Sequence, residues 1–556
     1  MKKILKLTIL IFLGYQCPLA AQTTKASSAN KKGLIISKTL SKEELKTWYH
    51  KDFAEDTIPG VSLEKAYREI IKDNKGQEVI VAVLDTKLDI HHEDLKDQIW
   101  RNTDEIPDNG IDDDKNGYID DSNGWDFLSN TKSEFVKYEH LESTRIVKKY
   151  NTLFKGKKAN QVSDQDQKSY GLYTKAYKKW ESDIVENKES QKNIQLLKDA
   201  IIYGTTLLDS IYPKKEYKLV ELDSLLQVYE NDSIAKNAIE GVQKGIRYDL
   251  TPKGLDVYIS NYKNREETIL RVDHNERAVP GDNPDDINDN HYGSPVVYGD
   301  VPFQHATAVA GTLGANRSND LGIKGFSDHI KIMPVVMVAT GDEHDKDVAL
   351  AIRYAVDNGA KVINMSWGKT LSLHEDWVQN AIRYAAEKDV LLITGGGNNN
   401  MNNDLQKSYP NDYTKEKEFV DNFIVVGAST WDLQNLRASF SNYGKKHVDV
   451  FAPGVDMYTT KYGNDAYTST RGTSLASPVV AGIAALIRAY YPKLSAKEVK
   501  QVILDSGTRY DFDVVVRKQK DEGSTMVPFS ELSKSGRIVN AYSALLLADQ
   551  ISKTKK

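Results

Sequence analysis

Continuous runs of apolar residues, rather than alternating ones, mark the strands expected in this chain. Runs of this kind cover residues 78–84, 330–338, 361–365, 390–393 and 423–426. They are typical of strands buried on both faces of a parallel sheet. Between them, residues 346–357 and 377–388 carry apolar residues at helical spacing, and Asn358-Gly359 closes the first helix. The pattern predicts an α/β domain with a doubly wound, mostly parallel sheet, whose ligand site lies at the carboxyl ends of the strands.

Residues from about 130 to 270 do not show this alternation of apolar runs and helical segments. They are rich in Lys, Glu, Asp, Gln and Tyr, and helical spacing recurs at 194–208 and 219–229. We interpret them as a helical insertion in one domain that spans residues 61–545, after an N-terminal segment at 23–60. Residues 546–556 are expected to form a tail, and its Lys-rich end at 552–556 is expected to fray. The insertion is either a solvated helical decoration or a module with a substrate-binding or regulatory role.

Composition narrows the class of protein. The chain has 556 residues, of which 40% are hydrophobic and 28% charged, so a large core can form. The formal net charge of -5 is too small to concentrate nucleic acid or an anionic membrane at the surface. Nucleic acid is therefore excluded as an expected partner.

The first 22 residues have the pattern of a signal peptide. Lys2 and Lys3 precede an apolar run from Ile4 to Leu13, and small residues follow at 20 and 21. The run is too short to cross a bilayer, and we expect no membrane span in the mature chain. The protein is expected to be exported to the periplasm or the extracellular space. The single cysteine, Cys17, lies in this segment, so the mature chain would have no disulfide and no thiol nucleophile.

Three separate motifs carry groups for nucleophilic catalysis. Ser474 lies in Arg471-Gly-Thr-Ser-Leu-Ala-Ser-Pro, at the expected start of a helix, where free N–H groups face a developing oxyanion. Asp85 ends the first buried strand, and His305 opens a helix of small residues. Each motif alone has a simpler explanation as a helix cap or a packed side chain. Their joint occurrence favours a catalytic set.

Together these residues resemble the subtilase family, whose triad runs Asp, His, Ser along the chain. The resemblance covers roughly residues 60–125 and 275–545. It implies that Asp85 is the orienting acid, His305 the general base and Ser474 the nucleophile. It also implies that Asn398 helps to hold the oxyanion. By the same resemblance, peptide substrate would pair as a strand with the segment Ser366, Trp367 and Gly368.

Three positions depart from the family pattern. Lys87 stands where the family usually has glycine, and Ala306 and Ala308 replace a glycine and a second histidine. If the backbone at Lys87 needs a positive φ, the lysine would be strained by about 1–2 kcal/mol. The resemblance implies a secreted serine endopeptidase acting on polypeptides, with no organic cofactor. The alternative is a catalytically impaired protein of the same fold that acts as a protein-binding module.

An acidic run at residues 108–121 suggests a structural calcium site. Its side chains follow the spacing of an EF-hand-type loop, with ligands expected from Asp112, Asp114, Asn116, the Tyr118 carbonyl and Asp120. Position 12 of such a loop is Asn123, rather than the usual glutamate. An acidic turn exposed to water is the other interpretation.

Overall fold

The computed structural model describes residues 39–214, 216–299, 301, 304–415, 417–517 and 523–555. The expected signal peptide at 1–22, with Cys17, lies outside the described residues. Within them, residues 178–271 form one compact unit, and residues 39–177 together with 272–555 form another. Each unit is described separately.

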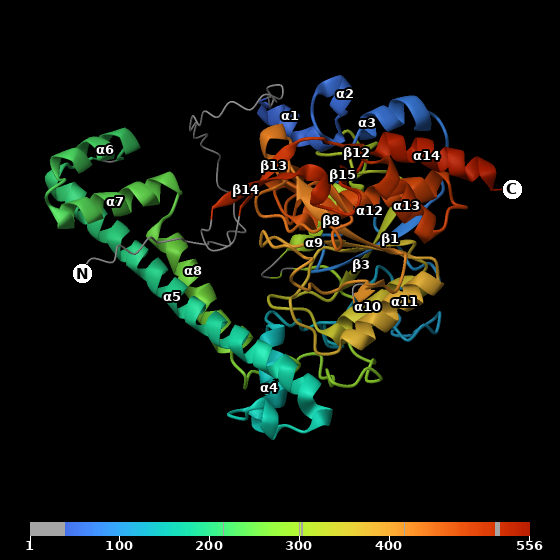
Figure 1. The fold of residues 1–556 in the computed structure, drawn as a ribbon, viewed down its shortest axis with the longest axis horizontal. Coiled ribbons are helices and arrows are strands. Elements are labelled where there is room, and N and C mark those ends of the chain that lie inside the picture. Colours follow the sequence, from blue (N-terminus) through green and yellow to red (C-terminus); the bar gives the residue numbers. More distant parts are fainter. Residues whose placement is uncertain are drawn as a thin grey trace. The chain divides into compact units, whose positions relative to one another are not determined.

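The larger unit is built on a nine-stranded sheet, in the order β12-β15-β9-β8-β5-β4-β1-β3-β2 (Figure 1). Every neighbouring pair in it is parallel except β12 and β15. Its strands are β1 (Val79–Asp85), β2 (Trp125–Asp126), β3 (Ile330–Val336), β4 (Val362–Met365), β5 (Leu391–Gly395), β8 (Phe423–Ser429), β9 (Val450–Pro453), β12 (Thr508–Arg509) and β15 (Arg537–Ile538). The mostly parallel α/β fold is thus confirmed, and the five apolar runs are five consecutive strands of the sheet, β8-β5-β4-β1-β3.

Helices cover both faces of this sheet. The helices of this unit include α4 (Glu142–Phe154), α9 (His305–Gly314), α10 (Asp345–Asp357), α11 (Glu375–Glu387), α12 (Thr473–Tyr490), α13 (Ala496–Ser506) and α14 (Ala541–Thr554). In β1, Val81 and Val83 pack into one core with α9 and α12, whereas Ala82 and Leu84 pack into a second core with α10 and α11. The alternation of side chains across the strand explains why the whole run is apolar.

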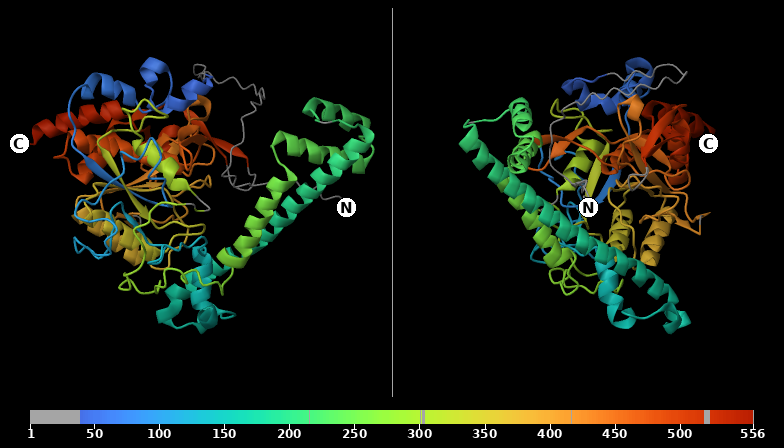
Figure 2. Two further views of the ribbon diagram at one scale, coloured as in Figure 1. Left: turned by 180° about the vertical axis from the view of Figure 1, so that it is seen from behind. Right: turned by 60° about the vertical axis from the view of Figure 1, so that its left-hand side comes forward.

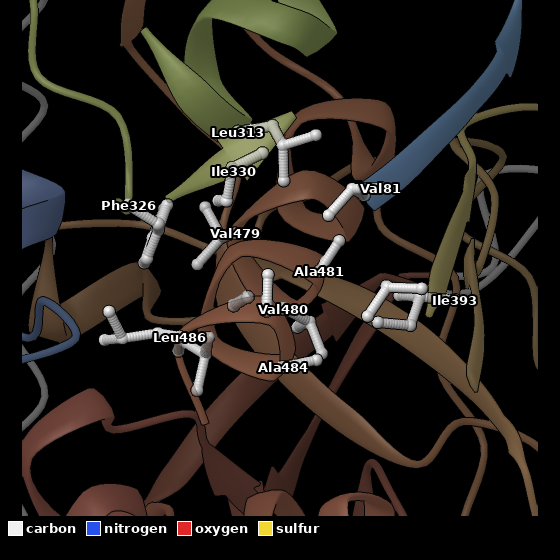
Figure 3. Close-up of a cluster of buried hydrophobic side chains, with 14 of the residues drawn as sticks. Val81, Leu313, Phe326, Ile330, Ile393, Val479, Val480, Ala481, Ala484 and Leu486 are labelled. Atoms are coloured by element: carbon white, nitrogen blue, oxygen red, sulfur yellow. The ribbon is translucent and has the colours of Figure 1, made fainter. Parts of the chain in front are cut away.

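Helix α12 crosses the centre of the first core. Its Val479, Val480, Ala484 and Leu486 are fully buried among side chains from the sheet and from α9 (Figure 3). Among the described residues, α12 is long and apolar enough to cross a membrane, but 89% of it is buried inside the protein. It is therefore the core helix of this unit, and its apolar composition reflects that burial.

Short paired strands form three two-stranded sheets outside the main sheet. They are β10 (Met457–Lys461) with β11 (Ala466–Thr470), β13 (Asp513–Arg517) with β14 (Ser524–Pro528), and β6 (Tyr413–Thr414) with β7 (Lys417–Glu418). The β10-β11 pair packs on α9, where the hydroxyl of Thr459 donates to the carbonyl of Ala308 at 2.7 Å. This contact holds the helix that begins at His305.

The described residues of the N-terminal segment at 23–60 pack in the larger unit. They contain α1 (Lys42–Thr47) and α2 (Phe53–Asp56), and α3 (Leu63–Ala66) follows directly. Trp48 is fully buried, and its indole N–H donates to the carbonyl of Val455 at 3.1 Å. Just after the segment, the carbonyl of Val61 accepts from the N–H of Ala541 in α14 at 2.7 Å. The boundary at residue 60 remains a prediction.

The unit at residues 178–271 is entirely helical. It contains most of α5 (Gln167–Ile211), with α6 (Leu219–Val228), α7 (Ser233–Arg247) and α8 (Pro252–Asn264). Figure 2 shows α5 and α8 side by side, and Ile194 and Ile201 pack there against Leu255 and Ile259. Residues 130–177, which we assigned to the insertion from sequence, fall in the larger unit. The boundaries of an insertion at 130–270 remain a prediction.

The last helix includes most of the expected tail. Helix α14 continues to Thr554, and the ammonium of Lys555 pairs with Glu498 at 2.5 Å. Leu545 and Ala548 of the same helix are buried in the first core. Fraying of the Lys-rich end at 552–556 remains a prediction.

Replacing Trp48 by alanine should destabilise the larger unit. The change removes a fully buried indole and leaves the carbonyl of Val455 without its donor, so we expect the free energy of unfolding to fall by about 3–5 kcal/mol. Denaturant unfolding measures the loss. Phe53→Ala in the same segment is the control, because Phe53 is 37% exposed and should lose much less. Equal losses would contradict the packing described here.

Candidate active site

Two predicted residues meet where β1 ends and α9 begins. Asp85 is the last residue of β1 and is 1% exposed, and His305 is the first residue of α9. Nδ1 of His305 lies 3.0 and 2.9 Å from the two carboxylate oxygens of Asp85. The N–H of Thr86 donates to Asp85 Oδ1 at 2.7 Å, which orients the carboxylate. The pair therefore fixes the tautomer of the imidazole, with Nδ1 protonated and Nε2 as the basic nitrogen.

The charge of His305 is set by two opposing effects. Burial alone would lower the pKa of the imidazole, but the Asp85 carboxylate beside it outweighs burial, and the pKa of His305 is raised above its ordinary value. The side chain of His305 is 17% exposed, so it still reaches solvent. A base of this kind is neutral at a pH above its raised pKa and can then accept a proton.

Ser474 lies in the first turn of α12, and an unusual helix start holds it there. Its hydroxyl donates to the carbonyl of Ser366 at 3.0 Å, and the hydroxyl of Ser366 donates back to the carbonyl of Ser474 at 2.9 Å. The second bond is available because residue 478, four positions along α12, is a proline without an N–H. Because Pro478 cannot donate to it, the Ser474 carbonyl accepts from the hydroxyl of Ser366, which directly follows β4.

Three donor atoms, two from Ser474 and one from Asn398, lie close together beside Gly472, which precedes α12. This glycine has a φ of +152°, and a Cβ built there would lie 3.6 Å from Ser474 N, 3.7 Å from Asn398 Nδ2 and 3.7 Å from Ser474 Oγ. Asn398 Oδ1 accepts from the N–H of Thr473 at 2.9 Å, which turns Nδ2 toward the same space. The backbone N–H of Ser474 and the amide of Asn398 therefore face one small space, as an oxyanion requires.

The segment Ser366 to Gly368 continues β4 beyond its paired residues. Pairing of β4 with β1 and β5 ends at Met365. The indole N–H of Trp367 donates to the carbonyl of Leu84 at 2.7 Å, so the segment is anchored to β1. A pocket beside it is lined by Val348, Trp367, Lys369, Val378 and Tyr409. The backbone here lies next to Ser474, where an extended peptide could pair with it.

The departures from the family pattern cause no strain. Among the described residues, the non-glycine positions with positive φ do not include Lys87. The Lys87 side chain is 5% exposed, and its ammonium lies 3.2 Å from the carboxylate of the fully buried Asp126. The condition for strain at Lys87 is therefore not met. Ala308 keeps its place through its carbonyl, which accepts from Thr459 and Thr312.

The acidic run gathers a different set of oxygens from the one expected. Carboxylate oxygens of Glu105, Asp114 and Asp121 lie within 4.8 Å of one another and could hold a metal ion. Burial raises the pKa of Asp121 to about 6, because charge on this carboxylate is poorly solvated. The sequence spacing did not indicate Glu105, which lies before the run. Asp121 is in the run but outside the expected ligand positions.

The remaining expected ligands have other contacts. The carboxylate of Asp112 accepts from the N–H groups of Asn116 and Gly117. The carboxylate of Asp120 accepts from those of Asn109 and Gly110. Asn116 Nδ2 donates to Asp114 and Asp121, and the ring of Tyr118 packs on Trp125 and Tyr354. Of the three expected carboxylate ligands, Asp114 is in the convergent set of acidic groups, while Asp112 and Asp120 close turns beside it.

A second set of groups that could hold a metal ion, Glu139, Glu276 and His344, is buried in the larger unit. Arginine side chains already balance the carboxylates: Arg145 Nε lies 3.2 Å from Glu276, and Arg277 lies 3.2 Å from Glu139. Burial would raise the pKa of Glu276, but Arg145, His344 and His140 together outweigh burial and hold that pKa well below its usual range. Two guanidinium groups so close would repel a cation, so we assign this set a structural role.

Comparison with known proteins is consistent with this geometry. Residues 76–525 match the Subtilase family, Peptidase_S8. Over 184 residues the chain is 41% identical to the Thermophilic serine proteinase of Bacillus sp. (strain AK1), covering 33% of this chain and 42% of that protein. Over 206 residues it is 35% identical to Subtilisin DY of Bacillus licheniformis, covering 37% of this chain and 70% of that protein.

Two further matches extend the comparison. Alkaline elastase YaB of Bacillus sp. (strain YaB) is 31% identical over 255 residues, which cover 46% of this chain and 58% of that protein. Among solved structures, a protease of Pseudoalteromonas arctica PAMC 21717 matches with 28% identity and a TM-score of 0.36, over 44% of this chain and 70% of that chain. The chain thus spans between about two fifths and seven tenths of the length of these relatives.

Removing the charge of Asp85 should reverse the shift at His305. In Asp85→Asn, burial remains while the carboxylate is lost, so the pKa of His305 should fall from above about 6.5 to below it. The raised pKa also means that the pair stabilises the fold at low pH, and that this stabilisation is lost as the pH rises through the pKa of folded His305. NMR titration of the His305 imidazole measures its pKa in wild type and in Asp85→Asn.

Asp89→Asn is the matched control for this titration. Asp89 lies in the loop after Asp85, but its carboxylate accepts from the N–H groups of His91 and Gly463. The pKa of His305 should stay unchanged in this variant. If Asp85→Asn also left it unchanged, the carboxylate would not set the charge of the imidazole.

Proposed function

The chain belongs to the subtilase family of serine proteases, and we propose that it is an exported endopeptidase that hydrolyses polypeptides through an acyl-enzyme on Ser474. The observation that carries the proposal is the contact of His305 Nδ1 with both carboxylate oxygens of Asp85, at the same sheet edge as the start of α12. A protein that only binds peptides has no need of a buried acid that orients an imidazole.

Acyl transfer uses these groups in a fixed order. The hydroxyl of Ser474, which donates to Ser366 in this structure, turns to His305 Nε2 and gives up its proton as Oγ attacks the substrate carbonyl. Asp85 stabilises the imidazolium that forms. The imidazolium then protonates the leaving amine, and water releases the acyl group by the same route.

Negative charge on the tetrahedral intermediate falls in the space beside Gly472. The Ser474 N–H and the amide of Asn398 are the donors that face it, and each is fixed before substrate arrives. Loss of one such donor typically costs about 2.7–4 kcal/mol in the transition state. Main-chain hydrogen bonds along Ser366 to Gly368 would hold the substrate extended while this charge develops.

The second candidate function is a protein-binding module that has lost catalysis. It was favoured by Lys87 and Ala308, the two departures nearest the predicted acid and base. Support for it weakens because Lys87 is accommodated by Asp126 and Ala308 leaves the contact between Asp85 and His305 in place. The enzyme is therefore the better proposal.

We further propose that Glu105, Asp114 and Asp121 hold a structural calcium ion. Carboxylate oxygens are the ligands that calcium prefers, and three of them converge here. A cation would also favour the charged form of Asp121, whose pKa is raised mainly by burial and to a smaller extent by Asp114. The ion has no step in the reaction. Its effect would be on the loop between β1 and β2, and hence on stability.

Export is part of the same proposal. It rests on the sequence of residues 1–22, which has the charge, apolar run and small residues of a signal peptide. The proposed destination is the periplasm or the outside of the cell.

A fluorophosphonate label and casein hydrolysis test the catalytic proposal. Full-length mature protein, starting at residue 23, should take up the label and cleave casein. Ser474→Ala and His305→Ala should do neither, because nucleophile and base act as a unit. Ser469→Ala in the adjacent strand β11 is the control and should behave like wild type. If folded wild type and Ser474→Ala are equally inert, the protein-binding alternative is correct.

Thermal unfolding in chelator and in calcium tests the metal proposal. At a calcium concentration of about a hundred times Kd, binding should raise the Tm by roughly 2–5 °C. Asp114→Ala and Asp121→Asn should abolish this increment. Asp112→Ala should lower the Tm through its two lost backbone contacts but keep the increment. The same Tm for wild type in chelator and in millimolar calcium would rule out the site.

A further inference from the structure

We propose that Asn442 is a positioning residue that fixes the amide of Asn398. The inference rests on the proposed function, in which that amide binds the oxyanion. Asn442 lies 44 positions along the chain, between β8 and β9, and is 5% exposed. Its side chain enters the loop that follows β5, and this loop carries Asn398.

The loop after β5 needs partners from outside itself. Pairing of β5 with β8 ends at Gly395, and the chain then turns through Gly397, with a φ of +105°, and Asn400, with a φ of +52°. Such an irregular backbone has no ladder to satisfy its N–H and C=O groups. Their partners decide where Asn398 points.

Asn442 supplies these partners on both sides of Asn398. Its backbone N–H donates to the carbonyl of Gly397 at 2.8 Å. Its side-chain Oδ1 accepts from the N–H of Asn399 at 3.0 Å and from that of Met401 at 2.9 Å. The residues before and after Asn398 are therefore bound to the same side chain or its backbone.

The side-chain amide nitrogen of Asn442 is linked through Asn403 to the start of the same loop at Gly396. Nδ2 donates to Asn403 Oδ1 at 3.1 Å, and Asn403 Nδ2 donates to the carbonyl of Gly396 at 3.0 Å. A Cβ at Gly397 would lie 2.4 Å from Asn442 Nδ2, so the glycine makes room for the amide. Only a side chain with both an acceptor and a donor can make this set of bonds, which explains asparagine at position 442.

These restraints act on the same amide that Thr473 orients. Asn398 Oδ1 accepts from Thr473 N, while Asn442 holds the backbone that carries Asn398. A loosened loop would leave substrate binding along Ser366 to Gly368 intact but would misplace the oxyanion donor. The predicted consequence is a fall in kcat with little change in KM, because the interaction is made only in the transition state.

Asn442→Asp and Asn442→Ala test the proposal. Asn442→Asp keeps both accepted bonds and loses the donor to Asn403, and Asn442→Ala loses all side-chain bonds. We expect kcat to fall by about 10-fold and about 100-fold respectively, up to the lower end of the roughly 100- to 1000-fold loss for removal of an oxyanion donor, and KM to change by less than about twofold. In the Asn398→Ala background, either change should lower kcat by less than about twofold further.

Asn422→Ala is the matched control. Asn422 is also buried, at 1% exposure, and its Nδ2 donates to the carbonyl of Val390 at the opposite, amino-terminal end of β5 and β8. It should lower the Tm and leave kcat unchanged. If Asn442→Ala does not fold, Asn403→Ala replaces it. That change removes the acceptor of Asn442 Nδ2, and its effect on kcat should show the same non-additivity with Asn398→Ala.

The outcomes separate the two proposals. If wild type cleaves casein but losses at 442 and 398 multiply, Asn442 does not act through Asn398 and the positioning role is wrong. The same holds if kcat is unchanged in both Asn442 variants. If wild type itself is inert, the proposed function fails, and the positioning role fails with it.

Discussion

The reciprocal hydrogen bonds between Ser366 and Ser474 join the sheet to the helix that carries the proposed nucleophile. The bond to the Ser474 carbonyl forms because Pro478 has no N–H to offer that carbonyl, so a proline inside the core helix provides half of the attachment. Ser477 strengthens it through a bond to Asn364 in β4. The position of Ser474 relative to the strand ends depends on this junction, as do the donors beside Gly472.

Sequence was sufficient for the parts of the molecule that follow simple periodic or local rules. Apolar runs located β1, β3, β4, β5 and β8, because parallel strands in the middle of a sheet are buried on both faces. Order and local motif placed Asp85 and His305 at adjacent ends of elements, where the structure brings them into contact. These are features that a few neighbouring residues determine.

Features that depend on distant contacts were not predictable in this way. Trp48 gave no sign that it reaches Val455, and nothing in the spacing around Asp114 pointed back to Glu105. The role of Asn442 is of the same kind, since it lies in a loop with no regular pattern and acts on a loop 44 positions away. Long-range packing decides such contacts, and a single sequence does not encode it in any local period.

The attachment of the N-terminal segment also affects when this protein can fold. Trp48 binds a carbonyl 407 positions along the chain, and Val61 binds Ala541 in the last helix. Contacts so distant in sequence close the core only after nearly the whole chain is available, and closing such loops is slow. The first described helices can therefore dock only after the last helix has been synthesised. The proposed nucleophile Ser474 also lies late in the sequence, so the proposed catalytic set is complete only when most of the chain is available.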